Sequence, residues 1–567
     1  MKLDLARLAP AHRSELDAIA LELRAPFNDL VQRLGAAHAA DIDWWITSVA
    51  SRNIFSCALF LRCCQLVLAR RIAAARDDLR EIVVETPALA AALRGALHTV
   101  SARIDVRPAR GIWPQRLRLY AGACYRWAAA AFHFLNQTFY ARVFSAPRAL
   151  TPAAPIVLID TFLYRNSFDG PFRDRHYPGL LETLTDAERA RVALLPSYYR
   201  IRNYARFFKA LRASPVQMLV KEDYLQPSDY VHALAHPWRS LRFAVEHCDF
   251  MGADIAPMVN EALLETFAAS GTLEGALRHR LARRLADARV PIAHLIDWFE
   301  NQEIDHGSNA GFRRYLPAVP ITGYQGFVVS RHYLCMFPTA EESKAAVIPH
   351  RVAVLGPGLV EPAQEFCAEL PVAVAPAFRF SGLWEHHEPR AHAGAFRILV
   401  ALPLMRHESG AILAMLEQAL TLEAAAAGWR VQAKAHPAFA KHLPSRYAAA
   451  QGDIDVLLRD ADVLVSSASS VCVQALAHGV PVIVVGSASG LTLNPVPPDA
   501  PQEMWRLCQT AAELAAALHG FSGHDAARTS LFRAHGTALR ERYFSRVTPE
   551  LVRAFLQIPP AADGRSC

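Results

Sequence analysis

Short apolar runs, each followed by a turn and a helical stretch, recur along this chain of 567 residues and constrain its fold more than any other feature. A continuous apolar run of roughly 4–8 residues is typical of a parallel strand that helices cover on both faces. One series of such runs lies at 155–163, 214–225, 290–302, 318–329 and 350–360. A second series lies at 395–404, 429–437, 463–467 and 481–486. Two such series predict two α/β domains, each built on a parallel sheet.

The segments around these runs set the expected domain boundaries. Residues 1–78 are predicted to form a helical N-terminal segment. The run Ile82–Val84, followed by a Thr-Pro turn and a helix, is interpreted as the first unit of a Rossmann-like domain over 79–370. A second Rossmann-like domain with C-terminal helices is expected over 371–567, because the stretch 357–395 is rich in proline and turn residues.

Residues 110–147 depart from this pattern, because aromatic residues and alanines are interleaved there with Arg, Gln, His and Asn. We expect a pair of helices, which either packs on the first domain as an insertion or lies in a membrane interface. Mean hydropathy is +0.12 and the formal net charge is +7. No apolar stretch reaches the roughly 18 residues of a spanning helix, and the charged N-terminus has no apolar signal-peptide core. The sequence therefore predicts a cytoplasmic protein, with peripheral contact to the cytoplasmic face of the inner membrane as an open alternative.

Missing motifs disfavour several catalytic classes. The ten cysteines are scattered without a C-x-x-C pair, as expected for reduced thiols in the cytosol. No Cys/His cluster or H-E-x-x-H motif indicates a metal, no P-loop indicates phosphoryl transfer, and no G-x-G-x-x-G after a strand indicates a dinucleotide. We therefore expect a protein without a metal or a cofactor.

A run of serines follows the predicted strand 463–466 directly. Ser466, Ser467, Ser469 and Ser470 precede a helix that ends at Gly479. One serine is enough to cap a helix, so four of them favour a phosphate site, where helix N–H groups and the helix dipole meet the anion.

A basic pair ends the preceding predicted strand. Lys434 and His436 alternate with alanines, so both side chains are expected on one side of the strand, with Pro437 after them. Ligands of doubly wound sheets bind beyond the carboxyl ends of the strands. There Lys434 would neutralise a phosphate and His436 would donate to it. A plain turn is the alternative for the His-Pro pair, since His236-Pro237 repeats it elsewhere.

These motifs resemble those of the bacterial sialyltransferases and polysialyltransferases and of the Kdo transferases of capsule synthesis. In those families the His-Pro and Ser-rich motifs hold the phosphate of a CMP-activated ulosonic acid. The stretch Ala475–Ile483, A-x-x-x-G-x-P-V-I, is similar to GT-B glycosyltransferases in general. The N-terminal half, with WWITSVASRN, LIDTFL and ITGYQG, resembles a group of surface carbohydrate biosynthesis proteins. The resemblance implies an α/β fold of the GT-B type, two Rossmann-like domains with a cleft between them, here with a helical N-terminal segment and a helical insertion.

The same resemblance implies a catalytic carboxylate in an acidic-acidic-Gly motif of the first domain. This chain has Phe168-Asp169-Gly170, which lacks one acidic residue and also fits a simple turn. Glu300 and Glu222 compete with Asp169, because each ends a predicted strand. Any of the three is suited to take the proton of an acceptor hydroxyl, or to act as the nucleophile if the transfer retains configuration.

Further polar residues lie where a substrate is expected. Asn301 and Gln302 follow Glu300, and Gln325 ends the next predicted strand, so these amides are candidate acceptor contacts. Ser409 precedes a helix of the second domain and is a candidate for the nucleotide phosphate. Arg379, at the domain junction, either meets a sugar carboxylate in bidentate fashion or forms a salt bridge at the junction.

Together with the resemblance, these residues predict a metal-independent glycosyltransferase of bacterial surface polysaccharide (capsule or O-antigen) synthesis. The expected donor is a CMP-activated 3-deoxy-ulosonic acid such as Kdo or a sialic acid relative. The expected acceptor is a surface polysaccharide or a lipid-linked glycan, and no nucleic acid partner is expected. The alternatives are a GT-B transferase with a UDP-sugar, GDP-sugar or CDP-glycerol donor, a non-catalytic assembly protein, and a hydrolase or epimerase on the same fold.

Overall fold

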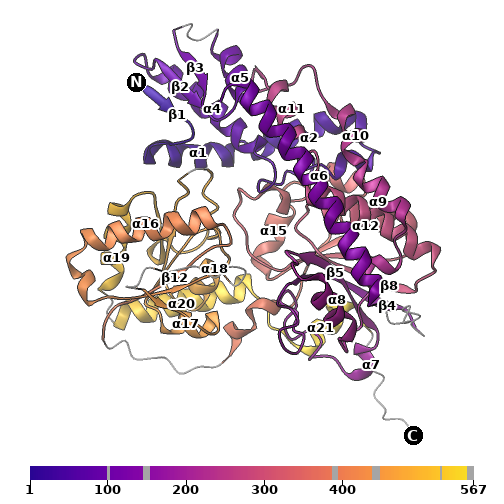
Figure 1. Cartoon of the computed structure of the whole chain (residues 1–567). Coiled ribbons are helices and arrows are strands. Elements are labelled where there is room, and N and C mark those ends of the chain that lie inside the picture. The colour runs from indigo at the N-terminus through magenta and orange to yellow at the C-terminus, as the bar shows by residue number, and fades with distance from the viewer. Residues whose placement is uncertain are drawn as a thin grey trace.

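The computed structural model describes residues 1–98, 103–144, 154–385, 394–436, 443, 447–488, 490–523 and 526–558. Two parallel sheets of six strands each form the centres of two α/β units (Figure 1). A three-stranded parallel sheet and several helices lie at the N-terminal end of the molecule (Figure 1). The predicted class, α/β with two Rossmann-like domains, is confirmed by this strand order.

The first large sheet has the order β5-β4-β8-β9-β10-β11, and each neighbouring pair is parallel. Its strands are β4 Ile156–Tyr164, β5 Val192–Tyr199, β8 Ile292–Trp298, β9 Ile321–Gln325, β10 Arg351–Val354 and β11 Val372–Val374. Helices α12 (Ser270–Asp287) and α13 (Glu303–Tyr315) cross closely beside it. A Cβ on Gly307 would lie 2.0 Å from the Gly275 carbonyl oxygen, so this crossing requires glycine.

The second large sheet has the order β14-β13-β12-β15-β16-β17, again entirely parallel. In chain order this is 3-2-1-4-5-6, the order typical of a Rossmann fold. Its strands are β12 Arg397–Ala401, β13 Arg430–Lys434, β14 Ala448–Ala449, β15 Val463–Ser466, β16 Val482–Val485 and β17 Trp505–Cys508. The central strands β15 and β16 are buried throughout, as their unbroken apolar sequence predicts.

The small sheet corrects one expectation. Ile82–Val84 was expected to begin the first Rossmann-like domain, but it belongs to β2 (Glu81–Val84), which pairs with β1 (Lys2–Asp4) and β3 (Asp105–Pro108). Its partner β1 lies at the start of the chain, so the pairing is non-local and is not visible in the pattern around residue 82. Helices α4 (Leu59–Ala75) and α5 (Pro87–Leu97) pack beside this sheet.

The described part of the region 110–147, which ends at residue 144, forms one helix and not the expected pair. Helix α6 (Ile112–Val143) runs for 32 residues without a break and has no proline after Pro114. It crosses the outside of the molecule from the small sheet to the first large sheet (Figure 1). Among the described residues, no helix is both long and apolar enough to cross a membrane.

Two further expectations were wrong. The stretch 214–225 is no strand, because it makes only one bridge, from Met218 to Leu194, and then a 3-10 helix, Lys221–Asp223. The strands β5, β11 and β17 were not predicted, and β17 lies in a region that was read as helical.

The remaining helices cover the sheets and connect the strands. In the N-terminal segment these are α1 Pro10–Glu22, α2 Arg24–Gly35 and α3 Ile42–Trp45. Around the first large sheet they are α7 Asp186–Arg189, α8 Tyr204–Ala213, α9 Pro227–Leu234, α10 His236–Ser240, α11 Ala256–Glu265, α14 Ala340–Lys344 and α15 Val360–Ala363, with a short hairpin of β6 Asp249–Phe250 and β7 Ala253–Asp254. In the second domain they are α16 Arg406–Leu422, α17 Ile454–Asp460, α18 Val471–Ala477, α19 Ala511–Ser522, α20 Ala526–Tyr543 and α21 Pro549–Leu556.

Contacts between the two domains come from the end of the chain and from one loop. Helix α21 returns to the first domain, where Phe555 packs on Tyr324 with ring centroids 5.2 Å apart. In the loop after β16, the Thr492 carbonyl oxygen lies 2.8 Å from His332 Nδ1, and the Thr492 N–H donates to Asp17 of α1. These contacts hold both large sheets and the N-terminal segment together.

Candidate functional site

The strand order indicates where a ligand would bind. In open parallel sheets ligands bind beyond the carboxyl ends of the strands, at the point where the strand order reverses. This point lies between β4 and β8 in the first sheet and between β12 and β15 in the second. The residues that follow these four strands are therefore the first candidates.

Glu300 follows β8 by two residues and is held by three hydrogen bonds. Its carboxylate accepts from Trp298 Nε1 at 2.9 Å, from Gln302 Nε2 at 2.7 Å and from the Tyr333 hydroxyl at 3.1 Å. Burial raises the pKa of Glu300 above its usual value, and the hydrogen bonds oppose that shift. A carboxylate in a fixed position with a raised pKa is suited to accept a proton from a hydroxyl group.

Two of the predicted amides point elsewhere. Asn301 has φ +55 and donates to Glu342 at 3.2 Å, within the buried region behind Glu300. Gln325 is buried and donates to the Met336 carbonyl at 2.8 Å. Of the three predicted amides, only Gln302 contacts Glu300.

A buried polar network supports Glu300 from behind. Arg52 makes a bidentate ion pair with Glu342 at 2.7 and 2.8 Å. Asn53 donates to the Gln302 side-chain oxygen at 3.1 Å and to Glu303 at 3.2 Å. The segment 44–53 thus serves to position Gln302 and, through it, Glu300. In the sequence, the polar residues Ser51, Arg52 and Asn53 interrupt an apolar stretch, and this pattern could have indicated a buried polar role.

Arg379 joins the two halves of the site. It lies in the 3-10 helix Phe378–Trp384 that connects the domains, and its side chain remains exposed to solvent. Its charge acts on Glu300, on Tyr164 at the end of β4, and on His436 of the second domain. Arg379 is therefore within electrostatic reach of two other predicted residues, Glu300 and His436.

Arg175 adds a second positive charge, which the sequence did not single out. It lies in the loop after β4, with its guanidinium carbon 5.4 Å from the centre of the Tyr164 ring. Among the described residues neither Arg175 nor Arg379 forms an ion pair. Burial, and then the charges of Arg379 and Arg175, lower the pKa of His436 to about 4. The imidazole is therefore neutral at pH 7 and has one N–H to donate.

The other members of the basic motif are placed differently. Lys434 is the last residue of β13, and its ammonium group donates to the Gly452 carbonyl at 2.6 Å. Pro437 lies outside the described residues.

A cavity of about 240 Å³ lies at the switch point of the second sheet. The residues that line it follow β12, β15 and β16 and are His407, Glu408, Ala411, Ile412, Ser467, Val485, Gly486, Ser487 and Ala488. Glu408 is 7% exposed, and its Oε2 has no hydrogen-bond partner among the described residues. Burial raises the pKa of Glu408 to about 7. This carboxyl group is suited to bind neutral hydroxyl or amide groups of a ligand.

The predicted serines lie in different surroundings in the structure. Ser467 lines the cavity, whereas Ser466 donates to the Ala401 carbonyl at 2.8 Å and Ser409 to the Pro403 carbonyl at 3.0 Å. Ser469 accepts from the Val471 N–H at 3.4 Å, and Ser470 precedes α18 without a side-chain capping bond. Sequence reasoning missed the stretch 486–490, which is rich in glycine and serine and follows a buried strand. That pattern could have indicated this wall of the cavity.

The competing carboxylates lie in other surroundings. Asp169 is exposed and pairs with the exposed Arg206 at 2.9 Å. Glu222 is buried and accepts from the Tyr198 hydroxyl at 2.9 Å, and burial raises its pKa. Within the described part of the chain, no group of three or more His, Cys, Asp or Glu residues is placed to hold a metal ion.

Comparisons with known proteins end at the level of architecture. No protein-family profile and no curated protein matches the sequence. Among solved structures, the chain is similar to S. aureus MnaA in a co-structure with UDP, with 10% identity over 71% of this chain and 98% of that one and a TM-score of 0.40. It is also similar to the glycosyltransferase SnogD from Streptomyces nogalater, with 14% identity over 71% of this chain and 99% of that one and a TM-score of 0.39. Acinetobacter baumannii MurG gives 11% identity over 71% of this chain and 99% of that one, with a TM-score of 0.35.

Proposed function

We propose that this protein is a glycosyltransferase that moves a sugar from a nucleotide donor to a hydroxyl group of a glycan acceptor. The observation that carries the proposal is that the charge of Arg379, in the connection between the domains, acts on Glu300 of the first domain and on His436 of the second. A carboxylate, an arginine without an ion-pair partner among the described residues and a neutral imidazole are the groups that such a transfer uses beyond the carboxyl ends of two parallel sheets.

Each group has a distinct part in the reaction. The bond between the anomeric carbon and the donor phosphate breaks, and a bond to the acceptor oxygen forms. Glu300 takes the proton that the acceptor hydroxyl loses. Arg379 and Arg175 stabilise the negative charge of the leaving phosphate, and His436 donates a hydrogen bond to it. The second-domain cavity beside Glu408 and Ser467 is the proposed nucleotide pocket.

The proposed donor is a CMP-activated 3-deoxy-ulosonic acid such as Kdo or a sialic acid relative. Two arginines without ion-pair partners among the described residues suit a donor with two anionic groups, here one phosphate and one sugar carboxylate. A UDP- or GDP-sugar carries two phosphates and would also suit the two arginines, and CDP-glycerol is a further alternative. We propose a metal-independent reaction in the synthesis of a bacterial surface polysaccharide.

Thermal unfolding with CMP, CDP-glycerol, UDP and GDP tests the donor class. A bound nucleotide at 100 times its Kd stabilises the folded state by about 2.7 kcal/mol. A rise in melting temperature with CMP alone supports the ulosonic acid donor, whereas a rise with another nucleotide transfers the proposal to that donor. No rise with any nucleotide contradicts the proposed function.

The variant His436→Ala separates a transferase from a folded assembly protein. A transferase is expected to lose turnover while its melting temperature is kept, whereas an assembly protein would still complement surface polysaccharide synthesis in cells. Release of free sugar without an acceptor, or interconversion of the donor sugar, would indicate the hydrolase or epimerase alternative.

We also propose that α6 rests on an anionic lipid surface at the cytoplasmic face of the membrane. Large apolar side chains are exposed along the whole helix: Trp113, Leu117, Tyr120, Tyr125, Phe132, Leu135, Phe139 and Val143. The helix also carries four arginines and no Asp or Glu. Apolar side chains flanked by arginine fit anionic lipids, and two copies of α6 would bring like charges together. A lipid-linked acceptor is consistent with this placement.

Flotation with vesicles tests the lipid contact. The full chain is expected to float with phosphatidylcholine vesicles that contain phosphatidylglycerol, and Leu117→Glu with Leu135→Glu should abolish flotation. Leu422→Glu, an equally exposed leucine of α16, is the matched control and should float. Equal flotation of all variants, or a dimer that Leu117→Glu dissociates, would contradict the lipid contact.

A further inference from the structure

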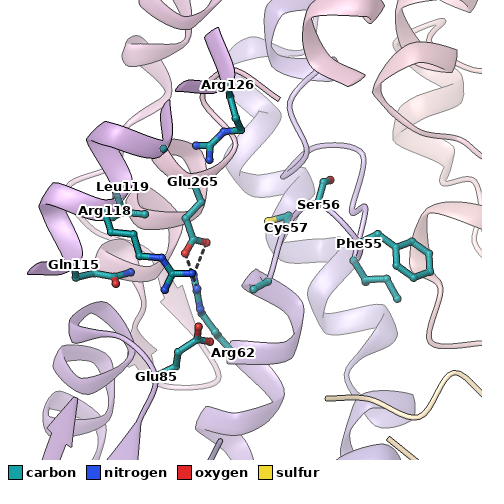
Figure 2. A pocket seen from close by; sticks show the side chains of 13 residues that line it. Phe55, Ser56, Cys57, Arg62, Glu85, Gln115, Arg118, Leu119, Arg126 and Glu265 are labelled. Atoms are coloured by element: carbon teal, nitrogen blue, oxygen red, sulfur yellow. Dashed lines mark hydrogen bonds and ion pairs between the residues drawn. The ribbon is translucent and has the colours of Figure 1, made fainter. Parts of the chain in front are cut away.

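A second cavity lies beside α6, and side chains of α6 line one of its walls (Figure 2). Its volume is about 380 Å³, within the range of small-molecule sites. Its walls are α6, the start of α4, the end of α11 and the segment 54–58. The lining residues with polar side chains are Ser56, Cys57, Arg62, Glu85, Gln115, Arg118, Arg126 and Glu265.

Among the described residues, one of the three arginines in this cavity has an ion-pair partner and the other two have none. Arg62 is buried and makes a bidentate ion pair with Glu265 at 2.8 and 2.9 Å. It also lies 3.2 Å from Glu261. Arg118 and Arg126 reach from α6 toward the same space (Figure 2) and form no ion pair with any described residue. Two positive charges therefore remain without a counter-charge in direct contact.

Several polar atoms at this cavity lack partners. Nε and Nη2 of Arg126 are buried without a hydrogen-bond acceptor among the described residues, as is Nε of Arg62. Gln115 is 4% exposed, and its side-chain oxygen also has no partner in that part of the chain. Unsatisfied buried polar groups are costly and rare in folded proteins. Three unused N–H donors call for a ligand that is rich in acceptor oxygens.

The sequence of α6 leaves room for Arg126 in this position. Gly122 lies one turn earlier, and a Cβ there would be 3.1 Å from Arg126 Nη1. A side chain at position 122 would thus crowd the guanidinium group where it borders the cavity. The glycine keeps this wall open in spite of its low helix propensity.

We propose that this cavity binds the phosphoryl group of a ligand that enters beside α6. Guanidinium groups match the geometry of phosphate oxygens, and two arginines balance the charge of a phosphate ester. Glu85, exposed on the opposite wall, accepts hydrogen bonds from hydroxyl groups of the same ligand. The phosphoryl group belongs either to a lipid headgroup at the membrane or to a water-soluble phosphate ester.

Two aromatic residues, Phe55 and Tyr333, connect the cavity to Glu300. Phe55 lines it, and the Phe55 ring packs on the ring of Tyr333 with centroids 4.7 Å apart. The Tyr333 hydroxyl in turn donates to Glu300. A ligand whose phosphoryl group is held in the cavity would have to extend past these two rings to reach the carboxylate. That this ligand is the acceptor rests on the proposed function, whereas the binding site itself does not.

Calorimetric titration of the full chain tests the site with three probes at constant ionic strength. These are inorganic phosphate, glycerol 3-phosphate, and monoacyl glycerol 3-phosphate below its micelle concentration. Arg118→Ala and Arg126→Ala are each expected to weaken binding roughly tenfold or more, because each removes charge-assisted hydrogen bonds. Arg283→Ala, an exposed arginine of α12, is the control and should bind as the unchanged protein does. Arg118 is exposed, so its replacement leaves the fold intact even if that of Arg126 does not.

The outcomes are distinct. Binding of the soluble ester that both arginine variants weaken assigns the site to soluble phosphate esters, and binding of the monoacyl probe alone assigns it to lipid headgroups. Absence of binding by every probe, or binding that Arg118→Ala leaves unchanged, overturns the proposal. The CMP-induced rise in melting temperature is measured in the same variants. A rise without phosphate binding would overturn this site alone, whereas the absence of a rise with CMP and with every other nucleotide tested would contradict the proposed function.

Discussion

Arg379 and His436 lie in different parts of the chain, and yet the guanidinium charge of Arg379 acts on the imidazole of His436. Burial comes first among the causes that lower the pKa of His436 to about 4, and the charges of Arg379 and Arg175 follow. Replacing Arg379 by methionine is expected to raise this pKa, and Arg175→Met to raise it by less. Histidine ring proton shifts followed by NMR against pH measure both. An unchanged pKa in Arg379→Met would show that the two residues do not share a site.

We expect the imidazole of His436 to take up a proton when a nucleotide binds. A phosphate near His436 favours the charged ring and raises its pKa, so binding should strengthen as the pH falls from 7 toward 5. Calorimetry in two buffers with different ionisation enthalpies counts the protons taken up. Without a ligand, a fall in pH has the opposite effect on His436, because it lowers the stability of the folded protein. The folded-state pKa lies below the unfolded value of 6.5, so His436 lowers stability as the pH falls from about 6.5 to 4.

Glu300→Gln is expected to lower turnover by about 10²–10⁴-fold, the usual contribution of a general base. The glutamine oxygen still accepts hydrogen bonds where the carboxylate did, so the fold should be kept, as circular dichroism and melting would show. Asp169→Asn is the matched control, because Asp169 is paired with Arg206 on the surface. If Glu300→Gln kept normal turnover and Asp169→Asn lost it, Asp169 and not Glu300 would be the general base.

We expect the protonation of Glu408 to contribute to the pH dependence of the free energy of unfolding. Burial raises its pKa from 4.5 to about 7, so the folded protein holds this proton in a range where the unfolded chain has lost it. Its contribution to stability is full below pH 4.5 and is lost as the pH rises through 7. Glu408→Gln is thus expected to be more stable than the unchanged protein at pH 8, by about 3 kcal/mol, and similar to it at pH 4. Urea unfolding at both pH values measures the difference, and the exposed Glu541→Gln should show none.

Arg52→Met should destabilise the protein by about 3–5 kcal/mol, because it leaves a buried carboxylate without its partner. Burial acts to raise the pKa of Glu342, but Arg52 and His306 lower it to about 2. The second replacement Glu342→Met is expected to recover part of the loss. Removal of the exposed Arg206, which pairs with Asp169, should cost less than about 1 kcal/mol in the same urea experiment. Equal effects of the two arginine variants would contradict the structural role of the buried pair.

Most of the strands that sequence reasoning located have a largely apolar sequence, and the exception is β13, whose sequence RVQAK alternates polar and apolar residues. β4, β8, β9, β10, β12, β13, β15 and β16 all lie within predicted runs. β5 was missed because its sequence VALLPSYY contains Pro196 and ends in polar residues. β2 was found, but it was assigned to the wrong sheet, because pairing with residues at the start of the chain leaves no local trace. Pairing partners over such distances follow from packing and not from periodicity.

The candidate site was predicted in part for the same reason. Glu300 and His436 were found because each follows a strand of a parallel sheet, where ligands bind. Asn301 satisfies the same rule, but its positive φ turns the side chain into the buried network. Arg175 and Glu408 were missed, because the side chains that face them come from distant strands, and only the folded chain brings those strands together.

The return of α21 to the first domain has a consequence for synthesis on the ribosome. Tyr324 of β9 is completely buried, and Phe555 of α21 is one of the rings that cover it. The domain that is made first thus keeps part of its interior uncovered until residues 549–556 have been translated. A nascent chain completes this earlier domain only when α21 has left the ribosome, so a chain that stops before residue 549 leaves Tyr324 without the ring of Phe555.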